Sequence, residues 1–197
     1  MTARSARYLG GALLVLLLAV LLAPSGARAQ LNLFGGYYEN VARAAAENDA
    51  ARVRQLVSGG DGRNANDTDE SGRTGLQIAA GNGNLQIAAI LIKAGANVNL
   101  KDKLGNTALH YATDRSQVEM ADLLLDVGAA VDAENRNGMT PLMIAAAHGQ
   151  GALVQALLNK GANVRKTDYT GRDALGWAED SRRPAIVQML QRAAAKR

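Results

Sequence analysis

The chain has 197 residues, of which 48% are hydrophobic and 20% charged, so it suits one modest folded domain with short extensions. It contains no cysteine, which excludes disulfides, a lipidated cysteine, a thiol nucleophile and a thiolate metal site. The formal net charge of +4 would suit a nucleic-acid partner, but part of that charge lies in the first thirty residues.

Residues 1–29 have the organisation of a secretory signal peptide. Arg4 and Arg7 precede an apolar run over residues 9–23, which is short compared with the roughly 20 residues of a membrane span. Ala27-Arg28-Ala29 then supplies the small-x-small pattern that signal peptidase cleaves. We therefore expect cleavage after Ala29 and a periplasmic or secreted protein. The alternative is that the leader stays as an N-terminal anchor.

Cleavage would change the charge balance. It removes Arg4, Arg7 and Arg28 and no acid, so 19 of the 22 basic residues face 18 acidic ones. The mature chain would then be nearly neutral, without a basic stripe to neutralise phosphates, and a nucleic-acid partner is not expected. Stable insertion into a membrane is not expected either once the leader is removed.

The segment over residues 30–38 follows the predicted cleavage point. Phe34, Tyr37 and Tyr38 hold three of the few aromatic side chains of the mature chain. We expect them to fold against the first helices as an apolar lid; a docking segment for another protein is the alternative.

A 33-residue period organises the rest of the chain. Four glycines open the related phrases GRTGLQIAA, GNTALHYAT, GMTPLMIAA and GRDALGWAE, and these glycines are Gly72, Gly105, Gly138 and Gly171. A fixed period of this length indicates one supersecondary unit copied and stacked. Stacked units form an extended surface, so the period favours binding of a partner.

The unit resembles the ankyrin repeat, whose phrase runs roughly D-x-x-G-x-T-P-L-H-x-A-A, followed by I-V-x-L-L-L and G-A-x-x-N. The fullest copy is NRNGMTPLMIAAAHGQGALVQALLNKGANVR over residues 135–165, and the resemblance extends from about Glu39 to the C-terminus. It implies an all-α solenoid of stacked helix-turn-helix units with projecting β-hairpin loops. The expected units are an N-terminal capping repeat, three regular repeats and a C-terminal capping repeat, over residues 39–66, 67–99, 100–132, 133–165 and 166–197.

The residue types fit such a unit. Pro141 falls at a first helical position, where its missing N–H does little harm. The side chains expected to cap the first helices are Thr74, Thr107, Thr140 and Asp173. The residues expected to be buried in the second helices are Ile87, Met120, Leu153 and Ile186, then Leu91, Leu124, Leu157 and Leu190.

Three expectations concern loops. Gly83 and Gly149 suit left-handed ends of the first helices; Ser116 takes their place in the middle copy, either by sequence drift or for a charged contact of Asp114 with Arg115. The four glycines of the repeat period are expected to be hinges at hairpin bases. The spacing of Gly60 and Gly95 exceeds the period by two, which predicts two extra residues in the loop over residues 64–72 and a longer hairpin there.

The chain lacks the marks of a catalytic or metal site. It has no G-x-S-x-G motif and no Cys, so we do not expect an enzyme, and no cofactor or metal is expected. His110 takes the histidine position of the repeat phrase, where the family uses it for structural hydrogen bonds. His148 is expected to be exposed in an inter-helix turn and available to a partner.

The resemblance implies that another protein binds to the hairpin tips and the exposed side of the first helices. Leu104, Met139 and Tyr169 would be apolar anchors in a polar, Arg-rich surround. The partner-binding positions are Glu70, Arg73, Lys103, Leu104, Asp114, Arg115, Arg136, Asn137, Met139, His148, Tyr169 and Arg172.

The expected function is a monomeric, non-catalytic interaction module, for example an accessory factor of a periplasmic enzyme. One alternative is an immunity or inhibitor protein that covers the active site of a toxin or enzyme. A small-ligand binder or an enzyme is the third class.

Overall fold

The computed structural model describes residues 40–58 and 63–195. The predicted signal peptide, its cleavage site and the segment 30–38 lie outside the described residues. None of the helices within the described ranges combines the length and apolarity that crossing a membrane would require.

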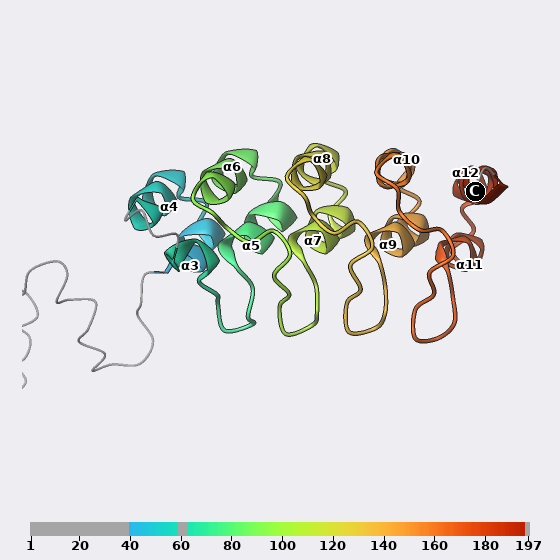
Figure 1. Cartoon of the computed structure of the whole chain (residues 1–197), viewed down its shortest axis with the longest axis horizontal. Coiled ribbons are helices and arrows are strands. Elements are labelled where there is room, and N and C mark those ends of the chain that lie inside the picture. Colours follow the sequence, from blue (N-terminus) through green and yellow to red (C-terminus); the bar gives the residue numbers. More distant parts are fainter. Residues whose placement is uncertain (1–39, 59–62, 196–197) are drawn as a thin grey trace, which may run out of the picture. The chain divides into compact units, whose positions relative to one another are not determined.

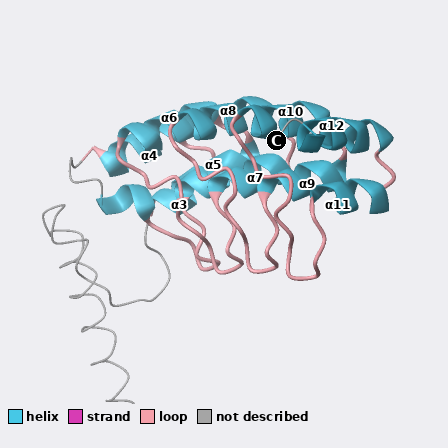
Figure 2. Cartoon of the chain, turned by 45° about the vertical axis from the view of Figure 1, so that its right-hand side comes forward, coloured by secondary structure: helices cyan, strands magenta, loops and turns pink. Residues whose placement is uncertain are grey.

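Ten α-helices follow one another as five antiparallel pairs, and no strand occurs in the described part of the chain. In Figure 1 the first helices of the pairs form one layer and the second helices another, and Figure 2 shows the hairpin loops projecting from the first-helix layer. The first helices are α3 (Val41–Ala46), α5 (Gly75–Asn82), α7 (Ala108–Asp114), α9 (Pro141–His148) and α11 (Ala174–Asp180). The second helices are α4 (Ala50–Val57), α6 (Leu85–Lys93), α8 (Val118–Asp126), α10 (Gly151–Asn159) and α12 (Pro184–Ala195). The predicted all-α solenoid is therefore confirmed.

The predicted caps begin the first helices. The side-chain oxygens of Thr74, Thr140 and Asp173 accept the backbone N–H three residues later, over 3.2, 3.4 and 2.8 Å. Thr107 is also in the extended N-cap conformation, but there the ring of His110 takes part instead, as described below. Pro141 is the first residue of α9, where it gives up no helical hydrogen bond.

The core lies between the two layers and is built from the positions that repeat. All eight second-helix residues predicted to be buried are at most 3% exposed. In the first helices, Leu76, Leu109 and Leu142 are fully buried, whereas Leu175 in α11 is only partly buried. The difference follows from position, because no later pair in the described chain packs on α11.

The turns inside the five pairs share one left-handed residue. These residues are Asn48, Gly83, Ser116, Gly149 and Arg182, with φ between 54° and 75°. The left-handed helix ends predicted at Gly83 and Gly149 are confirmed. Ser116 adopts the same conformation at φ 59°, and its hydroxyl accepts a hydrogen bond from Gln150 Nε2 over 2.6 Å. Asp114 and Arg115 do pair, at 3.5 Å, but on the exposed surface.

The prediction of a longer first hairpin is wrong. Asn66 accepts the backbone N–H of Asn97 just as Asn99, one period later, accepts that of Ala130, so the register is already regular at Asn66. The two extra residues therefore fall earlier, between the end of α4 and Asn66, where the short 3₁₀ helix η1 (Arg63–Asn66) lies. The glycine spacing predicted the number of extra residues but not their position. Extra residues can lie in any part of the loop that makes no hydrogen bond to the neighbouring repeat.

Candidate functional site

The four hairpin tips have the same backbone, organised by an acidic or amide side chain. In each tip this oxygen accepts two backbone N–H groups, from the residues two and four positions later. Asp102 Oδ1, for example, accepts from Leu104 and Asn106 over 2.9 and 2.8 Å. The tip residues that do this are Asp69, Asp102, Asn135 and Asp168.

Two of these carboxylates also tie the tip to the following first helix. The hydroxyl of Tyr111 donates to Asp102 Oδ2 over 2.6 Å, and Trp177 Nε1 donates to Asp168 Oδ2 over 3.0 Å. Burial, with the bond to Asp102, raises the pKa of Tyr111 to about 12. Burial alone would raise the pKa of Asp168, but hydrogen bonds from Thr170, Arg172 and Trp177 outweigh it, and that pKa lies below its usual range. These pairs were not predicted from the sequence, although in both an Asp stands nine residues before an aromatic residue.

Neighbouring tips are joined by backbone hydrogen bonds. The N–H groups of Lys103, Arg136 and Tyr169 donate to Ser71, Leu104 and Asn137 carbonyls over 3.3, 2.9 and 3.1 Å. The tips therefore form a continuous edge across the four hairpins.

The four period glycines lie inside these tip turns, which corrects their prediction as hinges at hairpin bases. Each closes its turn with φ between 76° and 85°, a region that other residues avoid. The next hairpin also comes very close: a Cβ built on Gly105 would lie 2.7 Å from the Arg136 nitrogen, and one on Gly138 would lie 2.7 Å from the Tyr169 ring. Gly171, in the last hairpin, has nothing within 4 Å. Glycine thus recurs at this position because the turn needs a left-handed backbone and because, in the inner hairpins, the next tip packs too close for a side chain.

Ten of the twelve predicted partner-binding residues are exposed, and Arg73 and Met139 are partly buried. Leu104 and Tyr169 are 62% and 73% exposed, which is unusual for large hydrophobic side chains in this protein. Met139 packs against the core with part of its side chain. The apolar anchors that the tips offer are therefore Leu104 and Tyr169.

Most of the cations on this side are paired with acids. Arg73 lies 2.8 Å from Asp69, and Arg172 lies 2.8 Å from Asp180 while stacking 4.5 Å above the Trp177 ring. Arg136 differs, since its guanidinium has no partner within the described residues. It is exposed and sits between the tips of Leu104 and Tyr169.

The first helices add a second row of residues on the same side. Tyr111, Ile144 and Trp177 occupy equivalent positions and are partly exposed, and the bonds of Tyr111 and Trp177 to tip carboxylates place this row beside the hairpins. The hairpin tips and this row together are called the tip face below.

His110 makes the structural hydrogen bonds that were predicted. Its Nδ1 accepts the Thr107 N–H over 3.2 Å, and its Nε2 lies 3.1 Å from the Met139 carbonyl, so the neutral ring donates through Nε2. Burial lowers the pKa of His110, which keeps the ring neutral. Gln77 does the same work one repeat earlier, accepting from Thr74 N–H over 2.7 Å and donating to the Asn106 carbonyl over 2.8 Å. His148 is exposed, as predicted.

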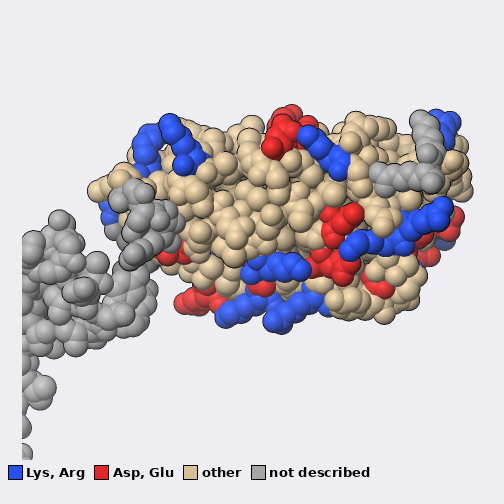
Figure 3. Space-filling model, in the orientation of Figure 1, with Lys and Arg blue, Asp and Glu red and all other residues tan. Residues whose placement is uncertain are grey.

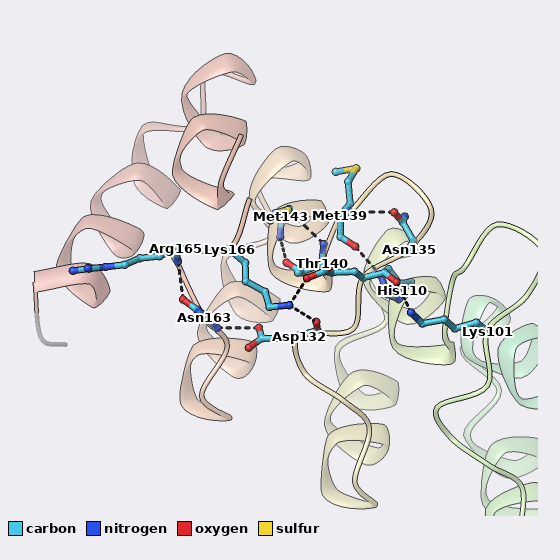
Figure 4. A network of polar contacts seen from close by, with 11 residues as sticks. Lys101, His110, Asp132, Asn135, Met139, Thr140, Met143, Asn163, Arg165 and Lys166 are labelled. Atoms are coloured by element: carbon cyan, nitrogen blue, oxygen red, sulfur yellow. Dashed lines mark hydrogen bonds and ion pairs between the residues drawn. The ribbon is translucent and has the colours of Figure 1, made fainter. Parts of the chain in front are cut away.

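Further polar contacts join neighbouring units, and Figure 4 shows them together with those of His110. Lys101 Nζ donates to the Glu134 carbonyl over 2.7 Å, and the Lys166 ammonium pairs with the Glu134 carboxylate. Asp132 Oδ1 accepts the Asn163 N–H over 2.9 Å. Lys101 and Lys166 therefore connect neighbouring repeats. Across residues 40–58 and 63–195, no three His, Asp or Glu side chains gather as a metal ion requires.

The family model of ankyrin repeats matches residues 41–135 and 127–196, nearly all of the described chain. The chain belongs to the ankyrin-repeat family. No curated protein shows a significant match to it. Membership in the ankyrin-repeat family supports a protein–protein interaction module in general, and the family is typically non-catalytic.

Proposed function

We propose that this ankyrin-repeat protein is exported and binds another protein through its tip face, without chemistry of its own. The main support for the proposal is that the repeats differ from one another in the side chains at their hairpin tips. The outermost tip position is occupied in turn by Glu70, Lys103, Arg136 and Tyr169, on a backbone that is the same in all four hairpins. The buried positions of the second helices, by contrast, vary only among aliphatic side chains and methionine.

The tip face is also held ready for a partner. Each tip is fixed by two side-chain hydrogen bonds and by a backbone bond to its neighbour, and Tyr111 and Trp177 brace two of them from the helices. A surface that is already ordered loses little conformational entropy on binding. Arg136 and Tyr169 are of the residue types that most often dominate the binding energy of an interface.

The signal-peptide pattern of residues 1–29 supports a place outside the cytoplasm. The partner that we propose there is a periplasmic enzyme. The chain is proposed to act as a monomeric accessory factor. N-terminal sequencing of the exported protein tests the first part: Gln30 is expected at the start, and a chain that begins at Met1 would contradict cleavage.

The binding surface is tested by affinity capture with two matched triple variants. Leu104→Ala/Arg136→Ala/Tyr169→Ala removes exposed side chains from the tips, and Leu85→Ala/Lys93→Ala/Val127→Ala removes exposed side chains from or next to the second helices. The tip variant is expected to lose a partner that the unaltered chain and the control retain, with unchanged helical circular dichroism in all three. Equal capture by the two variants would refute the proposed surface.

A further inference from the structure

We infer that the tip face binds an acidic segment of its partner protein, one in which carboxylates alternate with apolar side chains. This inference rests on the proposed function and specifies the chemistry of the partner.

The acids of the tips are directed into their own hairpins. The carboxylates of Asp69, Asp102 and Asp168 each accept two backbone N–H groups, and each takes a further hydrogen bond from Arg73, Tyr111 or Trp177. Their charge is therefore compensated before a partner arrives. Among residues 69–73, 102–106, 135–139 and 168–172, Glu70 is the one exposed acid, and it lies in the first hairpin.

The two middle tips present cations that no acid neutralises. Arg136 has no partner within the described chain, and Lys103 Nζ donates to the backbone carbonyl of Glu70 over 2.6 Å. Arg73, Arg115 and Arg172, by contrast, each have a carboxylate within 3.5 Å. Figure 3 shows Lys and Arg side chains along the lower, hairpin edge, with Asp and Glu side chains beside them. A carboxylate placed there would gain charge-assisted hydrogen bonds without displacing an existing pair.

Exposed apolar side chains lie in the hairpins on either side of Arg136. The Leu104 carbonyl of the preceding hairpin accepts the Arg136 N–H, and Tyr169 of the following hairpin donates its N–H to the Asn137 carbonyl. Carboxylates alone would leave this apolar surface in water. An anionic lipid surface fits less well, because its attraction grows with the number of basic residues near it, and two cations without an acidic partner in the described tips are few.

The inference can be tested with a library of random twelve-residue peptides displayed on phage and selected on the purified full chain. The same library is selected on Lys103→Glu/Arg136→Glu, and on Lys93→Glu/Arg192→Glu, which makes the same charge change at exposed positions of α6 and α12. Thermal melting confirms that each variant folds. The binding of selected peptides is then measured by fluorescence anisotropy at low and high salt.

Peptides rich in Asp and Glu are expected from the unaltered chain and from the control. The tip variant should bind those peptides about tenfold more weakly or worse, since two attractive pairs become repulsive. It should also select basic peptides instead.

Two results would overturn the inference in different ways. Selected peptides that need Leu104 and Tyr169 but show no excess of acids would leave the proposed function standing and refute the acidic partner. Peptides that bind all variants alike, or no selected peptide at all, would count against the tip face itself. Vesicles of an equimolar mixture of phosphatidylserine and phosphatidylcholine serve as a further probe. Vesicle binding that depends on Lys103 and Arg136 would overturn the inference, because the partner of the tip face would then be an anionic membrane and not an acidic protein segment.

Discussion

The second helices and the hairpin tips follow the same repeat period in opposite ways. In the second helices the side chains recur: an aliphatic residue or methionine fills each position from Ile87 to Ile186 because neighbouring units enclose it. In the tips the backbone recurs while the outermost side chain changes from acid to base to aromatic. The comparison shows that one period can encode a uniform scaffold and a varied surface, since only enclosed side chains must match their neighbours.

The largest effect is expected in the second helices. Leu124 in α8 is fully buried, so Leu124→Ala should lower the free energy of unfolding by roughly 2–5 kcal/mol through lost contacts and a cavity. Urea denaturation followed by circular dichroism measures this. The exposed Leu85, 42% accessible in α6, is the control, and Leu85→Ala should change stability by less than about 0.5 kcal/mol. Similar losses in the two variants would mean that the second helices are not the enclosed part of the unit.

An intermediate effect is expected at the tips, where backbone geometry matters. Gly105 and Gly171 share a left-handed φ, 78° and 85°, so alanine at either should lower the free energy of unfolding by about 1 kcal/mol. At Gly105 the new Cβ would also meet the Arg136 nitrogen at 2.7 Å, which should lower it by roughly 1–3 kcal/mol more. Denaturant midpoints of the two variants make the comparison. Equal losses would show that the tips do not pack on one another.

The smallest effect is expected in the pH dependence of stability, and it comes from His110, which links a first helix to the next hairpin. Because burial lowers the pKa of His110, the unfolded chain takes up a proton near pH 6.5 that the folded protein resists. The stability due to the neutral ring is therefore present above pH 6.5 and lost as the pH falls below it.

Melting curves between pH 7.5 and pH 5 test this, with His110→Gln as the comparison. Glutamine already makes the equivalent bonds at Gln77, so this variant should fold normally and its stability should depend less on pH. His148 is present in both proteins and does not affect the difference. The same pH dependence in the variant would exclude His110 as its source.

Particular residues show how far sequence reasoning reached. The caps at Thr74, Thr140 and Asp173, Pro141 and the buried second-helix rows were predicted correctly because each depends on a local rule or on the helical period. The exposed state of Leu104, Arg136 and Tyr169 was also predicted, from their positions in the repeat. The bonds of Tyr111 and Trp177 to tip carboxylates were missed, because their partners lie nine residues away across a turn and a helix start. The signal peptide, the repeat boundaries, export and the monomeric state stay predictions.

By itself the sequence determined the repeat, its length, the helix pairs and the residues that fill the interior, since a regular period leaves one way to enclose the apolar side chains. Only the tertiary structure showed that the two extra residues lie before Asn66 and that the four glycines lie at hairpin tips and not at hairpin bases. It also showed which arginines are paired with acids, in contrast to Arg136. These features depend on how close one unit comes to the next. A sequence records which residues recur, but distances between units arise only when the units are stacked.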